Sequence, residues 1–224
     1  MRRTTRILGT LLVAAGILTL AWVVVVWRFE DPFTALYTHF EQARLSHDYN
    51  KRAAAFHPRL SHSDLVSSER RVAAEAQAYA RTLKVGDPVG RLRIGRIGLN
   101  MVVVQGTDDG SLRRGPGHYV ASALPGEGHL IYVAGHRTTY LAPFAYINDI
   151  RVGDYVEFDV PYGAFTYRVT RHYVVPATDV SVLRDHGSEI LRLQACHPRF
   201  FATHRYIVDA KLVSVAPAFR SSSS

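Results

Sequence analysis

Residues 190–213 have the sequence ILRLQACHPRFFATHRYIVDAKLV, which contains the only cysteine of the chain. In the first half, Leu191, Leu193 and Ala195 alternate with more polar residues and with Cys196. This period of two is typical of a β-strand, and the second half shows a similar apolar run after a proline-containing turn. The stretch therefore predicts two strands joined by a loop.

The alternation also predicts which side chains accompany the cysteine. Successive side chains of a strand point to opposite faces, so Cys196 shares a face with Gln194 and Arg192, opposite Leu193. The second strand begins at Arg205, nine residues after the cysteine. Two strands joined by a loop can bring the thiol at the end of one beside the guanidinium at the start of the other.

A third reactive side chain follows another apolar run upstream, in GHLIYVAGHRTTY. Here His136 comes directly after Gly135, at the end of a predicted strand. Because a single cysteine cannot form an internal disulfide, Cys196 is either a buried, inert thiol or a reactive one.

Composition bounds the classes that fit. The chain has 224 residues, of which 47% are hydrophobic, enough for one domain of ordinary size with appendages. Its net charge is +8, but no run of Lys and Arg interleaved with aromatic residues follows one element. We therefore expect no nucleic-acid partner.

The first 30 residues have the pattern of a membrane anchor. Arg2, Arg3 and Arg6 precede the uncharged stretch ILGTLLVAAGILTLAWVVVVW, residues 7–27, which as a helix spans about 30 Å. The arginines predict a cytoplasmic N-terminus, with everything after Trp27 outside the cell. The alternative is a cleaved signal peptide, which would have a shorter apolar core and a small-x-small site, whereas VVVVWRFED follows here.

Residues 31–84 predict a helical stalk or linker between the anchor and the next domain. An apolar stripe predicts the first helix, formed by Phe33, Leu36, Tyr37, Phe40 and Leu45. A second helix, rich in Ala, Glu and Arg, would be capped by Ser63 or Asp64. The alternative is a partly disordered linker. Histidines in this zone lack the spacing of a metal site, and we expect neither a metal nor a cofactor.

Residues 85–215 change to short β runs punctuated by Gly, Pro, Asn and Asp, the pattern of a barrel or sandwich. The predicted strands before the cysteine are Arg91–Ile94, Leu99–Gln105, His129–Ala134, Tyr155–Val160 and Phe165–Val175. With the two strands around Cys196 and Arg205 these make seven, and we expect about eight in all. Residues 216–224 end in serines and are expected to be a disordered tail.

This β region resembles a sortase, most closely of the class E type. The motifs that carry the resemblance occur in order: IGRIGLNMVVVQGT, LRRGPGHY, ALPGEGHLIYVAGHRTTYLAPF, RVGDYVEF, TDVSVL, LQACHPRF and HRYIVDA. Each is weak alone, but their combination behind one apolar segment is specific. The resemblance covers residues 85–215 and excludes the stalk.

The resemblance implies a mainly β fold, an eight-stranded sortase-type β-barrel with short helices, preceded by the transmembrane helix and the stalk. It implies a cysteine transpeptidase of the Gram-positive cell envelope. Such an enzyme cuts a C-terminal sorting signal, LAXTG-like in class E, between Thr and Gly through a cysteine thioester. It then joins the acyl group to an amine. The implied partners are secreted proteins with that signal and an amine of a peptidoglycan precursor or pilin-like protein.

The resemblance also assigns site residues, and their chemistry agrees. Acyl transfer needs a nucleophile, a proton carrier and a group that stabilises the oxyanion, here Cys196, His136 and Arg205. Candidate substrate contacts are Tyr119, His118, Thr138 and Ala195.

Two residues differ from the family pattern. The family usually has a threonine directly before the cysteine, where this chain has Ala195, and a glycine is common where this chain has Leu141. Ala195 lacks a hydroxyl to offer the sorting signal, so the signal or the rate is expected to differ from the family norm.

Two alternatives remain open. One is a sortase-like domain that binds or scaffolds with little turnover, motivated by Ala195. The other is an unrelated cysteine peptidase, but papain-like enzymes place the nucleophile on a helix before the histidine, whereas the order here is His136, Cys196, Arg205. His197 and His204 diverge from their neighbours along an extended chain and are not expected to be the base.

Overall fold

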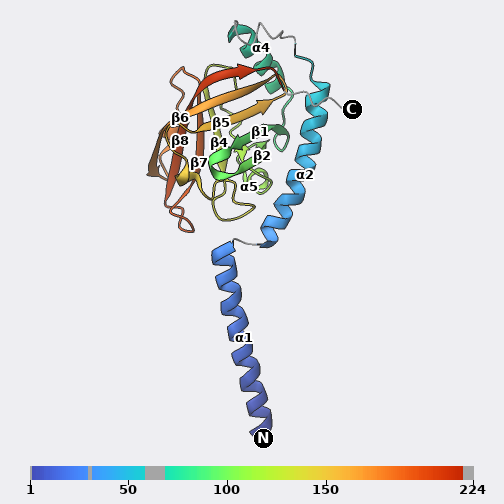
Figure 1. The fold of residues 1–224 in the computed structure, drawn as a ribbon, viewed down its shortest axis with the longest axis vertical. Helices are drawn as coiled ribbons and strands as arrows, with labels where there is room; N and C mark the ends of the chain where they lie inside the picture. The colour runs from blue at the N-terminus through green and yellow to red at the C-terminus, as the bar shows by residue number, and fades with distance from the viewer. Residues whose placement is uncertain (1, 30–31, 59–68, 219–224) are drawn as a thin grey trace.

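The computed structural model describes residues 2–29, 32–58 and 69–218. Its strands form a closed barrel in the order β1-β2-β3-β4-β7-β8-β6-β5 (Figure 1). The strands are β1 (Pro88–Ile94), β2 (Leu99–Gln105), β3 (Gly117–His118), β4 (Leu130–Gly135), β5 (Tyr155–Val160), β6 (Gly163–Pro176), β7 (Ile190–His197) and β8 (His204–Ala216). This confirms the predicted eight-stranded barrel.

Helices precede the barrel and occupy several of its connections. The long ones are α1 (Arg2–Phe29), α2 (Pro32–Ala55) and α4 (Glu69–Ala80). The short ones are α5 (Asp109–Leu112) and the 3₁₀ turns η1 (Gly95–Ile97), η2 (Ile147–Asp149) and η3 (Val180–Leu183). The predicted cap at Ser63 or Asp64 lies outside the described residues, as do residues 219–224 of the predicted tail.

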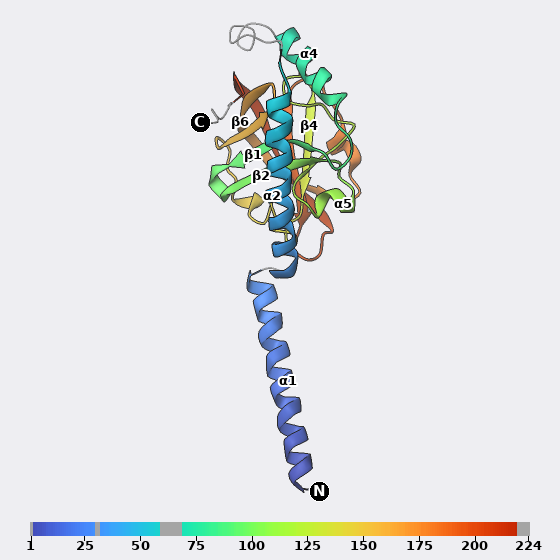
Figure 2. The same cartoon turned by 90° about the vertical axis from the view of Figure 1, so that its right-hand side faces the viewer.

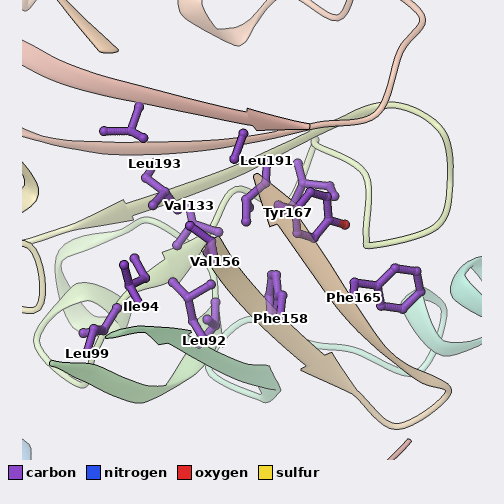
Figure 3. Packing of buried hydrophobic residues seen from close by; sticks show 14 of the residues in the cluster. Leu92, Ile94, Leu99, Val133, Val156, Phe158, Phe165, Tyr167, Leu191 and Leu193 are labelled. Carbon is purple, nitrogen blue, oxygen red and sulfur yellow. The ribbon is translucent and has the colours of Figure 1, made fainter. Parts of the chain in front are cut away.

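The barrel closes around an apolar core made by alternate residues of its strands. In β7, Leu191, Leu193 and Ala195 are buried, as their period predicted. Figure 3 shows Leu191 and Leu193 beside Val133 of β4 and Val156 of β5, with side chains directed into the same interior. Burying such side chains is worth about 1.5–3 kcal/mol each, so the interior face of these strands is strongly specified.

The sequence pattern located most strands but missed one. β2 and β5 have the predicted bounds, whereas β3 was not predicted. β3 comprises only two residues, Gly117 and His118, which pair with β2 on one side and β4 on the other. Two residues are too few to display a period, although they close the sheet between β2 and β4.

Helix α1 is long and apolar enough to cross a membrane. The qualifying segment, Arg3–Val24, has 22 residues and a mean hydropathy of 2.4, and none of it is buried within the molecule. The helix extends away from the barrel (Figures 1 and 2).

The zone predicted as a stalk contains two helices that pack on the barrel. Leu45 and Tyr49 of α2 are buried with Val102 and Val104 of β2. On α4, the buried residues Val72, Ala76 and Tyr79 belong to the main core. Both helices thus contribute to the folded barrel unit, and α2 runs along its side (Figure 2).

The apolar stripe predicted for α2 is not its packed face. Leu36, Tyr37 and Phe40 are exposed, and only Leu45 of the described stripe is buried. The reason is a polar contact that hydropathy does not reveal. The Gln42 side chain accepts a hydrogen bond from the backbone N–H of Val102 at 2.8 Å and donates one to the carbonyl of Val102 at 2.9 Å.

Candidate active site

The predicted catalytic residues lie on, or directly after, three neighbouring strands. β4 and β7 are parallel, with Gly135 opposite Ala195, so His136, the next residue after β4, follows at the level of Cys196. β7 and β8 are antiparallel, with Cys196 directly opposite Arg205. Neighbouring strands are about 4.8 Å apart, which places the thiol between the histidine and arginine positions.

Arg205 is held beside Cys196 by backbone carbonyls. Its Nη1 donates to the carbonyl of Ala202 at 2.8 Å and to that of His204 at 3.0 Å. Within the described residues both of its hydrogen bonds come from Nη1, so Nη2 and Nε are available to a substrate oxygen. The partially exposed thiol opposite it is a free cysteine.

His136 occupies a partly buried position at the end of β4. Its ring centroid lies 5.2 Å from that of Tyr140, and its Nε2 is buried without a hydrogen-bond partner among the described residues. Burial lowers the pKa of His136, and nearby Arg113 lowers it further, while Asp109 raises it. The neutral imidazole is therefore favoured at neutral pH, with one nitrogen available for proton transfer.

Arg137 is a site residue that sequence reasoning missed. It is 6% exposed. Its Nη1 donates to the carbonyl of Cys196 at 3.2 Å and lies 2.9 Å from Nδ1 of His197, while Nη2 donates to Oδ1 of Asn148 at 2.5 Å. This guanidinium connects the loop between β4 and η2 to the backbone at Cys196. Its adjacency to His136 was the only signal in the sequence.

His136, Cys196 and Arg205 form a row across the outer face of the sheet, here called the catalytic row. A polar layer lies next to it on the same face. The hydroxyl of Tyr132 on β4 donates to Oε1 of Gln194 on β7. Gln194 lies two residues before Cys196 and on the same face of the strand. The next layer is a buried ion pair, in which Arg192 donates to both carboxylate oxygens of Asp209 at 2.6 and 2.9 Å. Arg192 also donates to the carbonyl of Val182 in η3 at 2.5 Å, so η3 is fixed over this face.

The contacts of this layer argue against an alternative role for Arg205, as the ion-pair partner of Asp209. A strand arginine could simply pair with Asp209, which lies on the same face of β8. Instead, Asp209 is paired with Arg192 and with Arg171, whose Nε donates to Oδ2 at 2.9 Å. Arg205 therefore keeps its guanidinium at the thiol end of the strand pair.

The four predicted substrate contacts have different environments. Tyr119 is partly buried over β4, with its ring centroid 6.1 Å from that of Tyr132, and Thr138 is partly buried in the loop after His136. His118 is 1% exposed, and its Nε2 lies 2.9 Å from the carbonyl of Ala123. Ala195 is 1% exposed and belongs to the barrel core, on the opposite face from Cys196.

The backbone of the loop after His136 shows why a glycine is favoured where this chain has Leu141. Tyr140, Leu141 and Ala142 have φ values of 54°, 57° and 34°, in the left-handed region. Glycine adopts this region without the steric cost that a Cβ brings. Glycine is therefore favoured at a position such as Leu141, and this chain accepts a residue with a Cβ there.

Comparisons with known proteins agree with this geometry. The sortase domain family matches residues 92–213, more than half of the chain. A curated relative, sortase D of Bacillus subtilis (strain 168), is 33% identical over 135 residues, which cover 58% of this chain and 67% of the relative.

Solved structures show the same fold. Sortase E from Streptomyces avermitilis is 34% identical, with a TM-score of 0.55, covering 60% of this chain and 93% of that structure. The sortase D5 transpeptidase of Clostridium perfringens, at 23% identity, shares the fold with a TM-score of 0.63 over 78% of this chain and 99% of its own. With the family match, these similarities show that the chain belongs to the sortase family.

Proposed function

We propose that this sortase is a membrane-anchored cysteine transpeptidase of the class E type, which cleaves an LAXTG-like sorting signal between Thr and Gly. The observation that carries the proposal is the register of three strands, in which Cys196 lies opposite Arg205 and level with His136. Sortase E from Streptomyces avermitilis, at 34% identity, supports the class.

The proposed reaction proceeds in two balanced steps. The Cys196 thiolate attacks the carbonyl carbon of the signal threonine, and the bond to the glycine nitrogen breaks as His136 gives that nitrogen a proton. The product is a thioester on Cys196. An acceptor amine then attacks the thioester carbonyl, gives a proton to His136, and releases the thiolate.

Each neighbouring group has a role in these steps. Nη2 or Nε of Arg205 donates to the oxyanion that forms at the threonine carbonyl. Because burial lowers the pKa of His136, its protonated form is a minor species at neutral pH but a stronger acid, which gives its proton readily to the leaving glycine nitrogen. Arg137 positions the backbone of Cys196 through its hydrogen bond to that carbonyl.

We further propose that the signal binds along the outer face of β4 and β7, bordered by Tyr119 and Thr138. Gln194, which shares the face of Cys196, takes the contact that Ala195 cannot make because Ala195 is in the core. His118 is buried and is not included in this binding surface. Helix α1 would anchor the enzyme with the barrel outside the cell, where secreted proteins and amines of the cell envelope meet it.

The test is a reaction of the full-length protein with fluorogenic LAXTG and LPXTG peptides plus an amine, followed by mass spectrometry. We expect an acyl adduct on Cys196 and a transpeptidation product with LAXTG. Cys196→Ala and His136→Asn should abolish both, while His186→Asn, which alters an exposed histidine, should retain them. Wild-type-like turnover by Cys196→Ala would refute the proposal, and peptide binding without an adduct would favour a binding domain.

A further inference from the structure

Two large aromatic side chains project into solvent beside the catalytic row. Phe200 and Phe201, in the connection between β7 and β8, are 61% and 77% exposed. Phe200 and Ala202 have φ values of 73° and 53°, in a region that residues with a Cβ rarely adopt. The loop thus presents both rings outward from a strained backbone, which calls for an account in terms of function.

The catalytic end of the barrel is linked by direct contacts to the start of α2. The backbone N–H of Tyr140 donates to Oγ1 of Thr34 at 3.1 Å, and the Tyr140 ring lies 5.2 Å from that of His136. Thr34 is the third residue of α2, and α1 ends at Phe29. The loop that carries His136 therefore lies next to the outer end of the apolar helix.

The overall shape extends this relation to the β7–β8 connection. In both views the turn from β7 to β8 lies at the end of the barrel from which α1 departs, and α4 lies toward the opposite end (Figures 1 and 2). Phe200 and Phe201 are within that turn. If α1 spans a membrane, these two rings are on the side of the barrel that faces it.

Other exposed apolar side chains occur at the same end. Leu36, in the first turns of α2, is 57% exposed, and Leu141, in the loop after His136, is 37% exposed. Arg113, over the ring of Tyr140 and paired with Asp109 at 2.5 Å, is a basic residue whose side chain is 49% exposed. Aromatic and aliphatic side chains beside a basic residue are the composition that binds the interfacial region of a bilayer.

We propose that the catalytic end of the barrel rests on the lipid bilayer and that Phe200 and Phe201 insert into its interfacial region. The inference depends on the proposed anchoring by α1. The occupant of this apolar surface is the membrane, because α1 ends at Phe29, five residues before Thr34, which contacts the loop that carries His136. The chain itself therefore keeps this surface close to the lipid. The contact holds Cys196 close to the membrane surface.

The test measures lipid contact directly in the full-length protein. Cys196→Ala removes the only cysteine, and Phe201→Cys, or separately Phe200→Cys, then provides one site for an NBD fluorophore. The matched control is Ala74→Cys, at an exposed position on α4. Each labelled protein is reconstituted into vesicles of anionic and zwitterionic phospholipid, with or without lipids that carry a doxyl quencher on the upper acyl chain.

We expect the labels at positions 200 and 201 to shift to shorter emission wavelength and lose fluorescence with doxyl lipid, while iodide in the aqueous phase quenches only the label at position 74. Equal iodide quenching at all three positions would overturn the proposal. So would protection from both quenchers at positions 200 and 201, which would indicate a protein partner or a second copy.

Alkaline carbonate extraction of the same vesicles separates this inference from the proposed anchoring. Release of the protein by carbonate would refute the anchor and, with it, the membrane contact. Retention of the protein together with iodide-accessible labels at positions 200 and 201 would refute the membrane contact alone. Because every labelled protein lacks the nucleophile, neither outcome depends on whether the enzyme turns over substrate.

Discussion

Arg137 links the loop that carries the proposed base, His136, to the strand that carries the proposed nucleophile, Cys196. It does not touch the reacting atoms, and it acts by positioning Cys196 through the carbonyl of that residue. We predict that Arg137→Lys lowers kcat about tenfold with little change in KM, since lysine cannot reproduce the forked contacts to Cys196 and Asn148.

The measurement is steady-state kinetics of Arg137→Lys beside Arg184→Lys, which alters an exposed arginine. Thermal unfolding of both variants shows whether the fold is retained. If Arg137→Lys changed KM and kcat in parallel with a fall in Tm, the residue would have a structural role only, and the positioning role would be wrong.

Leu141 adopts a backbone conformation that favours glycine. We predict that Leu141→Gly leaves the free energy of unfolding within about 1 kcal/mol of wild type, because relief of left-handed strain offsets the greater entropy of glycine in the unfolded chain. Leu141→Val, with a β-branched side chain at the same φ, should be less stable than Leu141→Gly. Urea denaturation of the three proteins checks the order, and a Val variant equal to Gly would contradict it.

At the scale of elements, the buried ion pair fixes how β7 and β8 meet. Arg192 and Asp209 are directly opposite each other in the register, and their side chains are only 3% and 2% exposed. Because Arg192 lies four residues from Cys196 and Asp209 lies four residues from Arg205, the pair holds the two strands in the register that sets Cys196 opposite Arg205.

We predict that Asp209→Asn lowers the free energy of unfolding by about 3 kcal/mol, because the guanidinium of Arg192 stays buried without its counter-charge. Guanidinium chloride denaturation measures the change. The comparison is Arg44→Met, which removes an exposed pair with Glu41 and should cost less than about 1 kcal/mol. Similar midpoints for the two variants would show that the buried pair does not stabilise the strand alignment.

The same scale shows what the sequence could and could not predict. Strands with one face in the core were predictable because burial imposes a period of two, as in Leu191 and Leu193. The packed face of α2 was not, because it depends on Gln42 meeting the exposed backbone of β2 at Val102. That contact joins residues far apart in the chain, and neither residue signals it alone.

At the scale of the whole molecule, the candidate site also combines residues that the sequence predicted with one that it did not. The strand pattern predicted Cys196 at the end of one strand and Arg205 at the start of the next. The order of the motifs added His136, just after the end of a third strand. Arg137 depends on a partner about sixty residues away, so its role emerges only in the folded barrel. Membership of the sortase family was predicted from those motifs and is confirmed by the family match.

The barrel also carries a buried histidine that couples its stability to pH. Burial lowers the pKa of His118 from 6.5 to about 4, an effect that outweighs its contact with the carbonyl of Ala123. The unfolded chain therefore binds a proton at this residue at higher pH than the folded chain does. The contribution of neutral His118 to stability is complete above pH 6.5 and is lost progressively as the pH falls to about 4.

We predict from this shift that acidification from above pH 6.5 to about 4 removes roughly 3 kcal/mol of unfolding free energy through His118 alone, at 1.36 kcal/mol per pKa unit. Urea denaturation across this pH range measures it for wild type, for His118→Gln and for His186→Gln, which removes an exposed histidine. His118→Gln should be less stable near neutral pH but show a flatter pH profile than the other two proteins. A profile as steep as that of wild type would mean that His118 is not the group that titrates, because removing a group whose protonation drives the loss must remove that part of the slope.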